Sequence, residues 1–116
     1  MQVILKDLYL FGYHGVHPLE KKVGTPFTMN ITIELAVSQN IISIDDTLDY
    51  VRVYETVKRE FIEVEDLLEV LLERIISAIE KLSKQITAIE ITLEKLNAPI
   101  SGFNGKVGVR ITKSFI

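Results

Sequence analysis

The sequence predicts an α+β fold with the element order β-β-α-α-β-β. Alternating apolar and polar residues predict strands near both ends of the chain, and apolar residues spaced by three and four predict two helices between them. We expect a four-stranded, mostly antiparallel sheet with both helices packed on one face. At 116 residues, the chain is long enough for one domain, which we assign to residues 1–116.

Two strands are predicted in the first third of the chain. Residues 3–11 are rich in β-branched and aromatic types, and the glycines within residues 12–15 are expected to end this strand in a turn. Residues 16–25 contain a proline, a glycine and several charges, so we expect an exposed loop there. Residues 27–37 then alternate between an apolar and a polar face, which predicts the second strand.

Two helices are expected after a polar linker at residues 38–48. The first begins at Tyr50, and its apolar stripe consists of Tyr50, Val53, Tyr54, Val57, Phe61 and Val64. The apolar face of the second consists of Leu67, Leu68, Leu71, Leu72, Ile75, Ile79 and Leu82. Asp66 and Glu69 have the spacing of a helix cap followed by a glutamate at the third helical position.

The last two strands are predicted at residues 86–96 and 106–113, with a turn at residues 97–102 between them. An open sheet of four strands has two unpaired edges, which proteins must cover or pair. Joining copies edge to edge into a closed barrel removes both edges. We therefore expect a ring of identical subunits held together by strand pairing.

Composition excludes several classes of function. Apolar residues make up 47% and charged residues 25% of the chain, as in soluble globular proteins. The net charge is −3 with no long basic stretch, so we expect no nucleic-acid partner. No run approaches the roughly 18 apolar residues of a membrane span, and Lys6 interrupts the N-terminus too early for a signal peptide, so we expect no membrane partner.

The absence of cysteine also limits the chemistry. It excludes disulfides, thiolate nucleophiles and cysteine-ligated metals, and it favours a cytoplasmic location. His14 and His17 are the only histidines, too few for a three-histidine zinc site within one chain. We therefore expect no metal site.

Lys95 is the most informative candidate for catalysis. It shares strand phase with Ile91 and Leu93, so we expect its side chain to point toward the helix-covered face at the end of the strand. Loss of solvation there disfavours the charged form, which suits a general acid or base near neutral pH. The alternative is that the side chain extends from a fraying strand end into solvent.

The other candidates each have a structural alternative. Glu69 either caps the second helix or faces a pocket, where its carboxylate can accept two N–H groups from a planar heterocycle such as a pterin or guanine. Tyr50 and Tyr54 are expected to pack in the core, although Tyr50 at the helix start can also reach a cleft or a neighbouring subunit. Glu20 is expected to be a solvated loop charge, and His14 packs beside the glycines or binds a ligand.

Taken together, four segments resemble the dihydroneopterin aldolase family of the folate pathway. They are Phe11-Gly12-Tyr13-His14-Gly15 with Glu20, Thr47-Leu48-Asp49-Tyr50 with Val53-Tyr54, Leu67-Leu68-Glu69 with Glu73-Arg74, and Lys95-Leu96-Asn97-Ala98-Pro99-Ile100. Each segment is weak alone, but the ordered set is specific and covers essentially the whole chain. It implies the tunnelling fold, in which four subunits form a barrel, two such rings stack into an octamer, and active sites lie between adjacent subunits.

The resemblance also implies a reaction. The family cleaves 7,8-dihydroneopterin by a retro-aldol step to 6-hydroxymethyl-7,8-dihydropterin and glycolaldehyde. The substrate's own N5=C6 double bond accepts the electrons, so neither a cofactor, a metal nor a Schiff base is needed. Two alternatives stay open: epimerisation at C2′ of this substrate or of its triphosphate, for which Lys21 and Lys22 are candidate cations, and a non-catalytic module that binds pterins or purines.

Three residues match the family's catalytic positions. Lys95 matches the lysine that transfers protons, and Tyr50 matches a tyrosine contributed by the adjacent subunit. Glu20 matches a loop glutamate that approaches the hydroxylated side chain of the substrate. The resemblance therefore implies proton transfer at Lys95 with Tyr50 as its partner, and hydroxyl orientation by Glu20.

Three further residues match positions that bind the pterin. Glu69 matches the glutamate that anchors the amino-pyrimidine edge, and Leu68 and Leu48 match residues whose backbones contact the ring. The chain departs from the family at Leu96 and Ser101, where proline is common. Because proline fixes φ, these two changes affect the rigidity of the loop and not a matched side chain.

Overall fold

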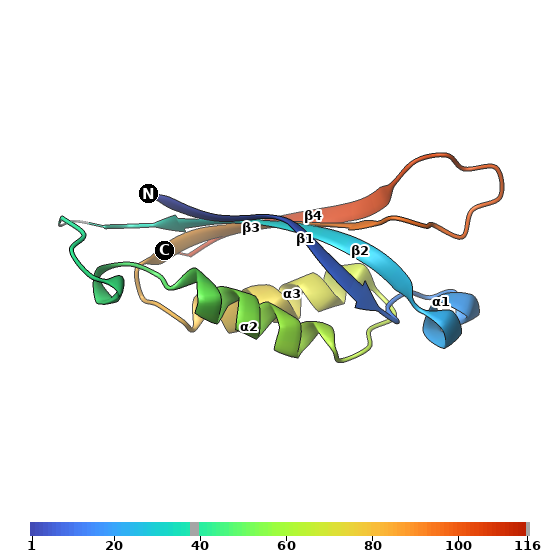
Figure 1. Cartoon of the computed structure of the whole chain (residues 1–116), viewed down its shortest axis with the longest axis horizontal. Helices are drawn as coiled ribbons and strands as arrows, with labels where there is room; N and C mark the ends of the chain where they lie inside the picture. The colour runs from blue at the N-terminus through green and yellow to red at the C-terminus, as the bar shows by residue number, and fades with distance from the viewer. Residues whose placement is uncertain (38–39, 116) are drawn as a thin grey trace.

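A single antiparallel sheet and two long helices make up most of the molecule. The computed structural model describes residues 1–37 and 40–115. Its elements are β1 (Gln2–Gly12), α1 (Pro18–Val23), β2 (Thr25–Leu35), a 3-10 helix η1 (Ile44–Asp46), α2 (Tyr50–Phe61), α3 (Leu68–Glu80), β3 (Ile86–Lys95) and β4 (Val107–Ser114). The strands pair in the order β1-β2-β3-β4, all antiparallel, and α2 and α3 cover one face of the sheet (Figure 1). The predicted α+β architecture is confirmed.

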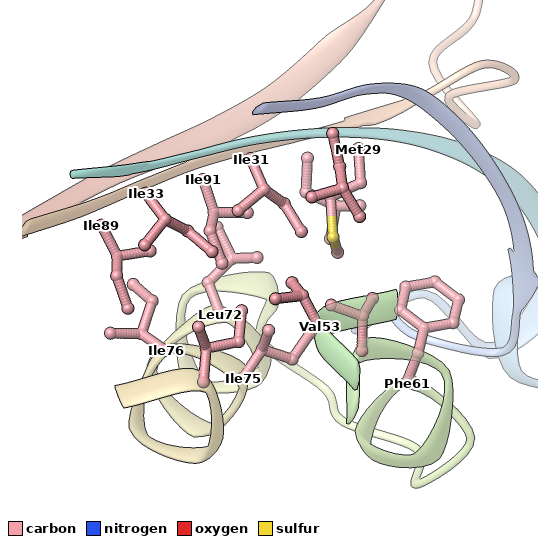
Figure 2. Close-up of a cluster of buried hydrophobic side chains, with 14 of the residues drawn as sticks. Met29, Ile31, Ile33, Val53, Phe61, Leu72, Ile75, Ile76, Ile89 and Ile91 are labelled. Carbon is pink, nitrogen blue, oxygen red and sulfur yellow. The ribbon is translucent and has the colours of Figure 1, made fainter. Parts of the chain in front are cut away.

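The core lies between the inner face of the sheet and the two long helices (Figure 2). Period-two alternation turns every second residue of β2 and β3 inward, and the fully buried ones are Phe27, Met29, Ile31, Ile33, Ile89, Ile91 and Leu93. The helices bury against them Val53, Val57, Phe61, Leu71, Leu72, Ile75, Ile76 and Ile79. Burial of this continuous apolar layer is the main contribution that stabilises the fold.

Helix α2 begins at Tyr50 as predicted, because the Asp49 carboxylate accepts a hydrogen bond from Val51 N at 2.9 Å. Its buried face is narrower than the predicted stripe. The centre of that face passes through Val53 and Val57, which leaves Tyr50 and Tyr54 on its margin, 64% and 37% exposed. Val64 lies beyond the helix end and is exposed. The prediction that both tyrosines pack in the core was wrong.

The predicted cap of the second helix was also wrong. Helix α3 has Leu67 at its N-cap position with no side-chain hydrogen bond, and the Asp66 carboxylate instead forms an ion pair with Lys21. Glu69 is therefore the second helical residue, and its exposed carboxylate caps nothing. Pairing with a cation distant in sequence has replaced the local capping interaction.

Residues 16–25 are not the exposed loop that their composition suggested. They contain α1, whose start is fixed by a reciprocal cap: Leu19 N donates to His17 Nδ1 at 3.3 Å, and His17 N donates to a Glu20 carboxylate oxygen at 3.4 Å. Pro18 occupies the first helical position, where its missing N–H costs nothing. This short helix turns Glu20 into the protein, where it is 4% exposed.

Strand β1 contains an irregularity that bends the edge of the sheet (Figure 1). The register shifts between Leu5 and Leu8, Asp7 adopts a φ of 57°, and its N–H donates to Asn30 Oδ1 at 2.8 Å. Within residues 1–37 and 40–115, the outer edges of β1 and β4 have no partner strand. Assembly of such edges into a ring stays a prediction.

The linker between β2 and α2 includes η1, whose start is held by two backbone amides that donate to Asp46 Oδ2. Ser38 and Gln39, part of the predicted linker, lie outside the described residues. In the described part of the chain, no helix combines the length and the apolar character that crossing a bilayer requires.

Candidate active site

A cavity of about 530 Å³ opens at the end of β3, between α1, the α2–α3 connection and the start of β4. Its charged lining consists of Glu20, Asp66, Glu69 and Lys95. Apolar residues, including Val16, Leu67, Leu68, Val107 and Val109, supply much of the remaining wall. This size and mixture of lining are typical of small-molecule sites.

Lys95 is the last residue of β3 and points toward the helix-covered side of the sheet. It pairs with Phe27 of β2 and with Val107 of β4, both of which turn the same way, and its side chain is 14% exposed. The predicted inward orientation is confirmed, and the solvent-exposed alternative was wrong. Its Nζ lies 2.5 Å from Oε2 of Glu20, which makes a buried ion pair at the cavity wall.

Glu20 is held from two sides. Its Oε1 accepts the backbone N–H of His17, and Gly15, at a φ of 135°, packs so closely that a Cβ there would collide with the carboxylate. Oε2 contacts Lys95 as an ion pair without the angular geometry of a hydrogen bond, so it has no hydrogen-bond partner within the described residues. A buried carboxylate oxygen with this spare capacity can accept a hydrogen bond from a bound hydroxyl.

Leu68 and Glu69 form the first turn of α3 and line the same cavity. The Glu69 carboxylate makes no hydrogen bond or ion pair with another residue in the part of the chain that the structure describes. It is therefore available to N–H groups of a ligand, and the helix start favours negative charge at this position. Four of the six predicted site residues, Glu20, Leu68, Glu69 and Lys95, thus meet at one cavity.

Tyr50 and Leu48 are not part of that cavity. They lie at the opposite end of α2, a helix of 12 residues and thus about 18 Å in length. Leu48 is buried beside a separate polar pocket of about 330 Å³, which Asp49, Arg52 and Gln85 also line. Within one chain, then, the structure does not bring Tyr50 or Leu48 near Lys95.

Several lining residues were missed by sequence reasoning. The local pattern makes Asp66 a helix cap, yet its side chain lines the cavity and pairs with Lys21. A usable signal for a helix was present at His17 and Pro18, because proline is common at the first helical position and glutamate at the third. This short helix turns Glu20 inward. Val107 and Val109 reach the cavity wall only because β4 pairs with β3.

His14 packs in the core beside the glycines and is fully buried. Its Nδ1 accepts the N–H of Glu65 at 3.1 Å, so Nε2 carries the proton and donates to Phe61 O at 2.8 Å. Burial lowers the pKa of this imidazole; Arg74 lowers it further, while the bond to Phe61 and the charge of Glu65 act in the opposite direction. In residues 1–37 and 40–115, no three histidine or carboxylate side chains form a group suited to a metal ion.

The fold and this cavity define an α+β protein with a candidate small-molecule cavity at the end of its third strand. The protein-family model described as FolB, dihydroneopterin aldolase, matches residues 3–112. The chain is 30% identical over 115 residues to a dihydroneopterin aldolase of Staphylococcus epidermidis, covering 96% of this chain and 94% of that relative. The chain belongs to the dihydroneopterin aldolase family, and it is an enzyme of the lyase class.

Solved structures share the fold. An E. coli dihydroneopterin aldolase in complex with neopterin superposes with a TM-score of 0.80 at 18% identity, covering 98% of this chain and 99% of that one. A dihydroneopterin aldolase from a Burkholderia species, bound to guanine, gives 0.79 at 14% identity, covering 100% and 92%. At these identities the likeness concerns the fold, and the predicted tunnelling fold is confirmed.

Proposed function

We propose that the cavity binds 7,8-dihydroneopterin and cleaves it to 6-hydroxymethyl-7,8-dihydropterin and glycolaldehyde, as a step of folate biosynthesis. The observation that carries this proposal is the meeting of Lys95, Glu20 and Glu69 at one cavity. The family supplies the reaction class, and the relatives bound to neopterin and to guanine support a flat ring with an amino-pyrimidine edge as the ligand.

Glu69 is proposed to hold the pterin. Its carboxylate is free of contacts within the described residues, and two parallel N–H donors of an amino-pyrimidine match the two oxygens of a carboxylate. Leu68 precedes it at the helix start, where a backbone group can meet the same ring. The volume of about 530 Å³ leaves room for the bicyclic ring and its three-carbon side chain.

The chemistry is proposed to need only proton transfer from the protein. Removal of the proton on the 2′-hydroxyl breaks the C1′–C2′ bond, and the released electron pair moves into the N5=C6 imine to give an enamine. Protonation of the enamine at C1′ completes the product. Lys95, whose Nζ lies 2.5 Å from Oε2 of Glu20, transfers these protons through water, and Glu20 orients the side-chain hydroxyls. Neither a metal nor a Schiff base enters, because the substrate carries its own electron sink.

A site between subunits is part of the proposal. Tyr50 is 64% exposed at the far end of α2, where it can contact a neighbouring chain, and Leu48 lies beside it. We propose that they complete the cavity of an adjacent subunit in a ring of four, two rings forming the octamer. The proposed cytoplasmic location rests on the cysteine-free sequence alone.

Mixing subunits tests the shared site. Tyr50→Phe and Lys95→Ala oligomers should each have low activity, and dissociating and reassembling them together should restore activity at sites that combine two intact contributors. No recovery in verified mixed oligomers would contradict a site made by two chains.

The cavity favours an unphosphorylated substrate over a triphosphate. Three carboxylates line it, and Lys21, one of the two lysines considered for a triphosphate, is already paired with Asp66. Added negative charge near such a lining costs binding energy. Epimerisation at C2′ of dihydroneopterin itself shares the cleaved intermediate and stays within the proposal as a side activity.

Product identification tests the proposal. The protein is incubated separately with 7,8-dihydroneopterin and with its triphosphate, and the products are separated by chromatography. Glycolaldehyde and 6-hydroxymethyl-7,8-dihydropterin from the first substrate support the aldolase. Only the 2′-epimer would make it an epimerase, and tight binding without turnover would make it a binding module.

A further inference from the structure

We propose that His14 is a positioning residue that fixes the pterin-binding end of α3 through the backbone of Glu65. The inference rests on the proposed function, since it concerns the same cavity. His14 itself does not line that cavity.

The imidazole joins the α2–α3 connection to the end of α2. Its Nδ1 accepts the Glu65 N–H in the α2–α3 connection, and its Nε2–H donates to the carbonyl of Phe61 at the end of α2. The ring also packs edge-to-face on Phe61 and on Phe27 of β2, with centroid distances of 4.4 and 5.8 Å. His14 thus fastens the connection to the sheet.

The connection is held from its other sides as well. Gly15 N donates to Glu65 O at 2.9 Å, directly beside the histidine bond. Arg74 of α3 donates to the carbonyls of Glu60 and Glu63 and forms an ion pair with the Glu65 carboxylate. Three residues after Glu65 the helix begins, and its second residue is Glu69. A shift at Glu65 is therefore passed to Glu69 over about one turn of chain.

The same segment touches the catalytic half of the cavity. Gly15 packs against the Glu20 carboxylate, and Phe27, which supports the imidazole ring, pairs with Lys95 across β2 and β3. His14 therefore lies where the supports of Glu20, Lys95 and Glu69 meet. This arrangement gives the buried histidine a role in setting the distance between Glu69, which is proposed to bind the pterin, and the ion pair of Lys95 with Glu20.

Two variants separate positioning from packing. His14→Phe keeps an aromatic ring in the core but loses both hydrogen bonds, whereas His14→Asn keeps an acceptor, Oδ1, close to the place of Nδ1. Ile33→Ala is the matched control, because Ile33 is fully buried in β2 toward the end of the sheet away from Lys95. For each variant the Tm, the neopterin Kd, and the KM and kcat for 7,8-dihydroneopterin are measured.

We expect His14→Phe to raise the neopterin Kd and KM about five- to tenfold, the change that corresponds to one neutral hydrogen bond, with a smaller effect on kcat. His14→Asn should recover most of the affinity. Ile33→Ala should leave the affinity for neopterin unchanged, although its Tm should fall about as much as that of His14→Phe. Equal Kd values for His14→Phe and the control, or no recovery in His14→Asn, would overturn the inference.

The pH profile provides a readout that does not need the phenylalanine variant to fold. Protonation of Nδ1 would break the bond to Glu65; the charged groups facing the ring are Glu65 and Arg74, and burial keeps the pKa below the ordinary 6.5. Wild-type affinity for neopterin should therefore fall as the pH drops through the folded pKa, which burial places below 6.5, and the His14→Asn profile should be flatter. Parallel profiles would overturn the inference.

Amide hydrogen exchange separates this inference from the proposed function. If the wild type fails to bind neopterin, the proposed function fails. Exchange of the amides of residues 65–69 still tests whether His14 holds this segment in place. Faster exchange there in His14→Phe than in Ile33→Ala, with slower exchange in His14→Asn than in His14→Phe, supports the role of His14. Equal exchange in all three would refute it.

Discussion

The ammonium group of Lys95 lies 2.5 Å from a buried carboxylate oxygen of Glu20, although the two residues come from opposite ends of the chain. A buried ion pair is weak evidence for stability, because the loss of hydration offsets the attraction between the charges. This pair lies at the wall of a cavity that Glu69 also lines. Its position therefore favours a role in proton transfer over a role in holding the fold together.

Removing the Lys95 ammonium should abolish most of the turnover. We expect Lys95→Ala to lower kcat by roughly 10²-fold or more, the usual scale for losing a general acid or base, while neopterin binding survives because Glu69 is untouched. Steady-state kinetics and a fluorescence titration measure the two effects. Lys106→Ala, an exposed lysine before β4, is the control. Turnover equal to wild type in Lys95→Ala would remove it from the mechanism.

Loss of the Glu69 carboxylate should act on binding. Glu69→Ala is expected to weaken neopterin binding by about 1.5–3 kcal/mol, which is typical of a charge-assisted hydrogen bond. The Tm should change little, because Glu69 caps nothing and is exposed. Glu73→Ala, one turn further along α3 and paired with Lys113, provides the comparison. Unaltered affinity measured by titration would show that the ring is held elsewhere.

A side chain at Gly15 should disturb Glu20 directly. Gly15 has a φ of 135°, and a Cβ there would collide with the Glu20 carboxylate, so Gly15→Ala should lose about 1 kcal/mol or more of stability and much of the turnover. Gly102→Ala is the matched control, since its φ is 74° but nothing lies within 4 Å of the added Cβ. Gly102→Ala therefore has the backbone strain of a positive φ without a collision, and this variant should stay active. Equal kinetics for the two variants would contradict the proposed role of Glu20.

The stability of the fold should depend on His14 below neutral pH. Its pKa is lowered from 6.5 by burial, so the unfolded chain binds the proton more readily than the folded one. The contribution to stability is complete above about pH 6.5 and is lost as the pH falls through the folded value. Urea unfolding between pH 7 and 5 should show this loss in wild type and less of it in His14→Asn; identical slopes would argue against it.

Asp46 is a second group that makes the stability of the fold depend on pH. The N–H groups of Ile42 and Ser43 bind its carboxylate and lower the pKa from 3.8, although burial acts in the opposite direction. Its contribution to stability is complete above about pH 3.8 and is lost as the pH falls through the folded value.

The sequence was sufficient for the elements that follow from periodicity. Alternation in β3 was enough to direct Lys95 toward the helices, because successive strand residues point to opposite faces and its neighbours in phase are apolar. The same reasoning failed for Tyr50 and Tyr54. A stripe with helical spacing does not show where the centre of the buried face lies, and packing against α3 and the sheet places it on Val53 and Val57.

Charged side chains were harder to place than apolar ones. The polar segment around Glu20, taken alone, predicts a solvated charge, yet the cap at His17 and the contact with Gly15 turn the carboxylate inward. Asp66 fits the local pattern of a helix cap equally well, and only the proximity of Lys21 in space decides its partner. Such pairings depend on how α1 packs against the α2–α3 connection, which no local pattern contains.

In the proposed mechanism the polypeptide binds a flat ring and transfers protons, while the N5=C6 bond of the substrate accepts the electrons. The most direct measurement is the rate of glycolaldehyde release from 7,8-dihydroneopterin by metal-stripped protein with EDTA present. We expect a rate equal to that of untreated protein. Loss of release under EDTA, followed by recovery on adding zinc, would contradict it.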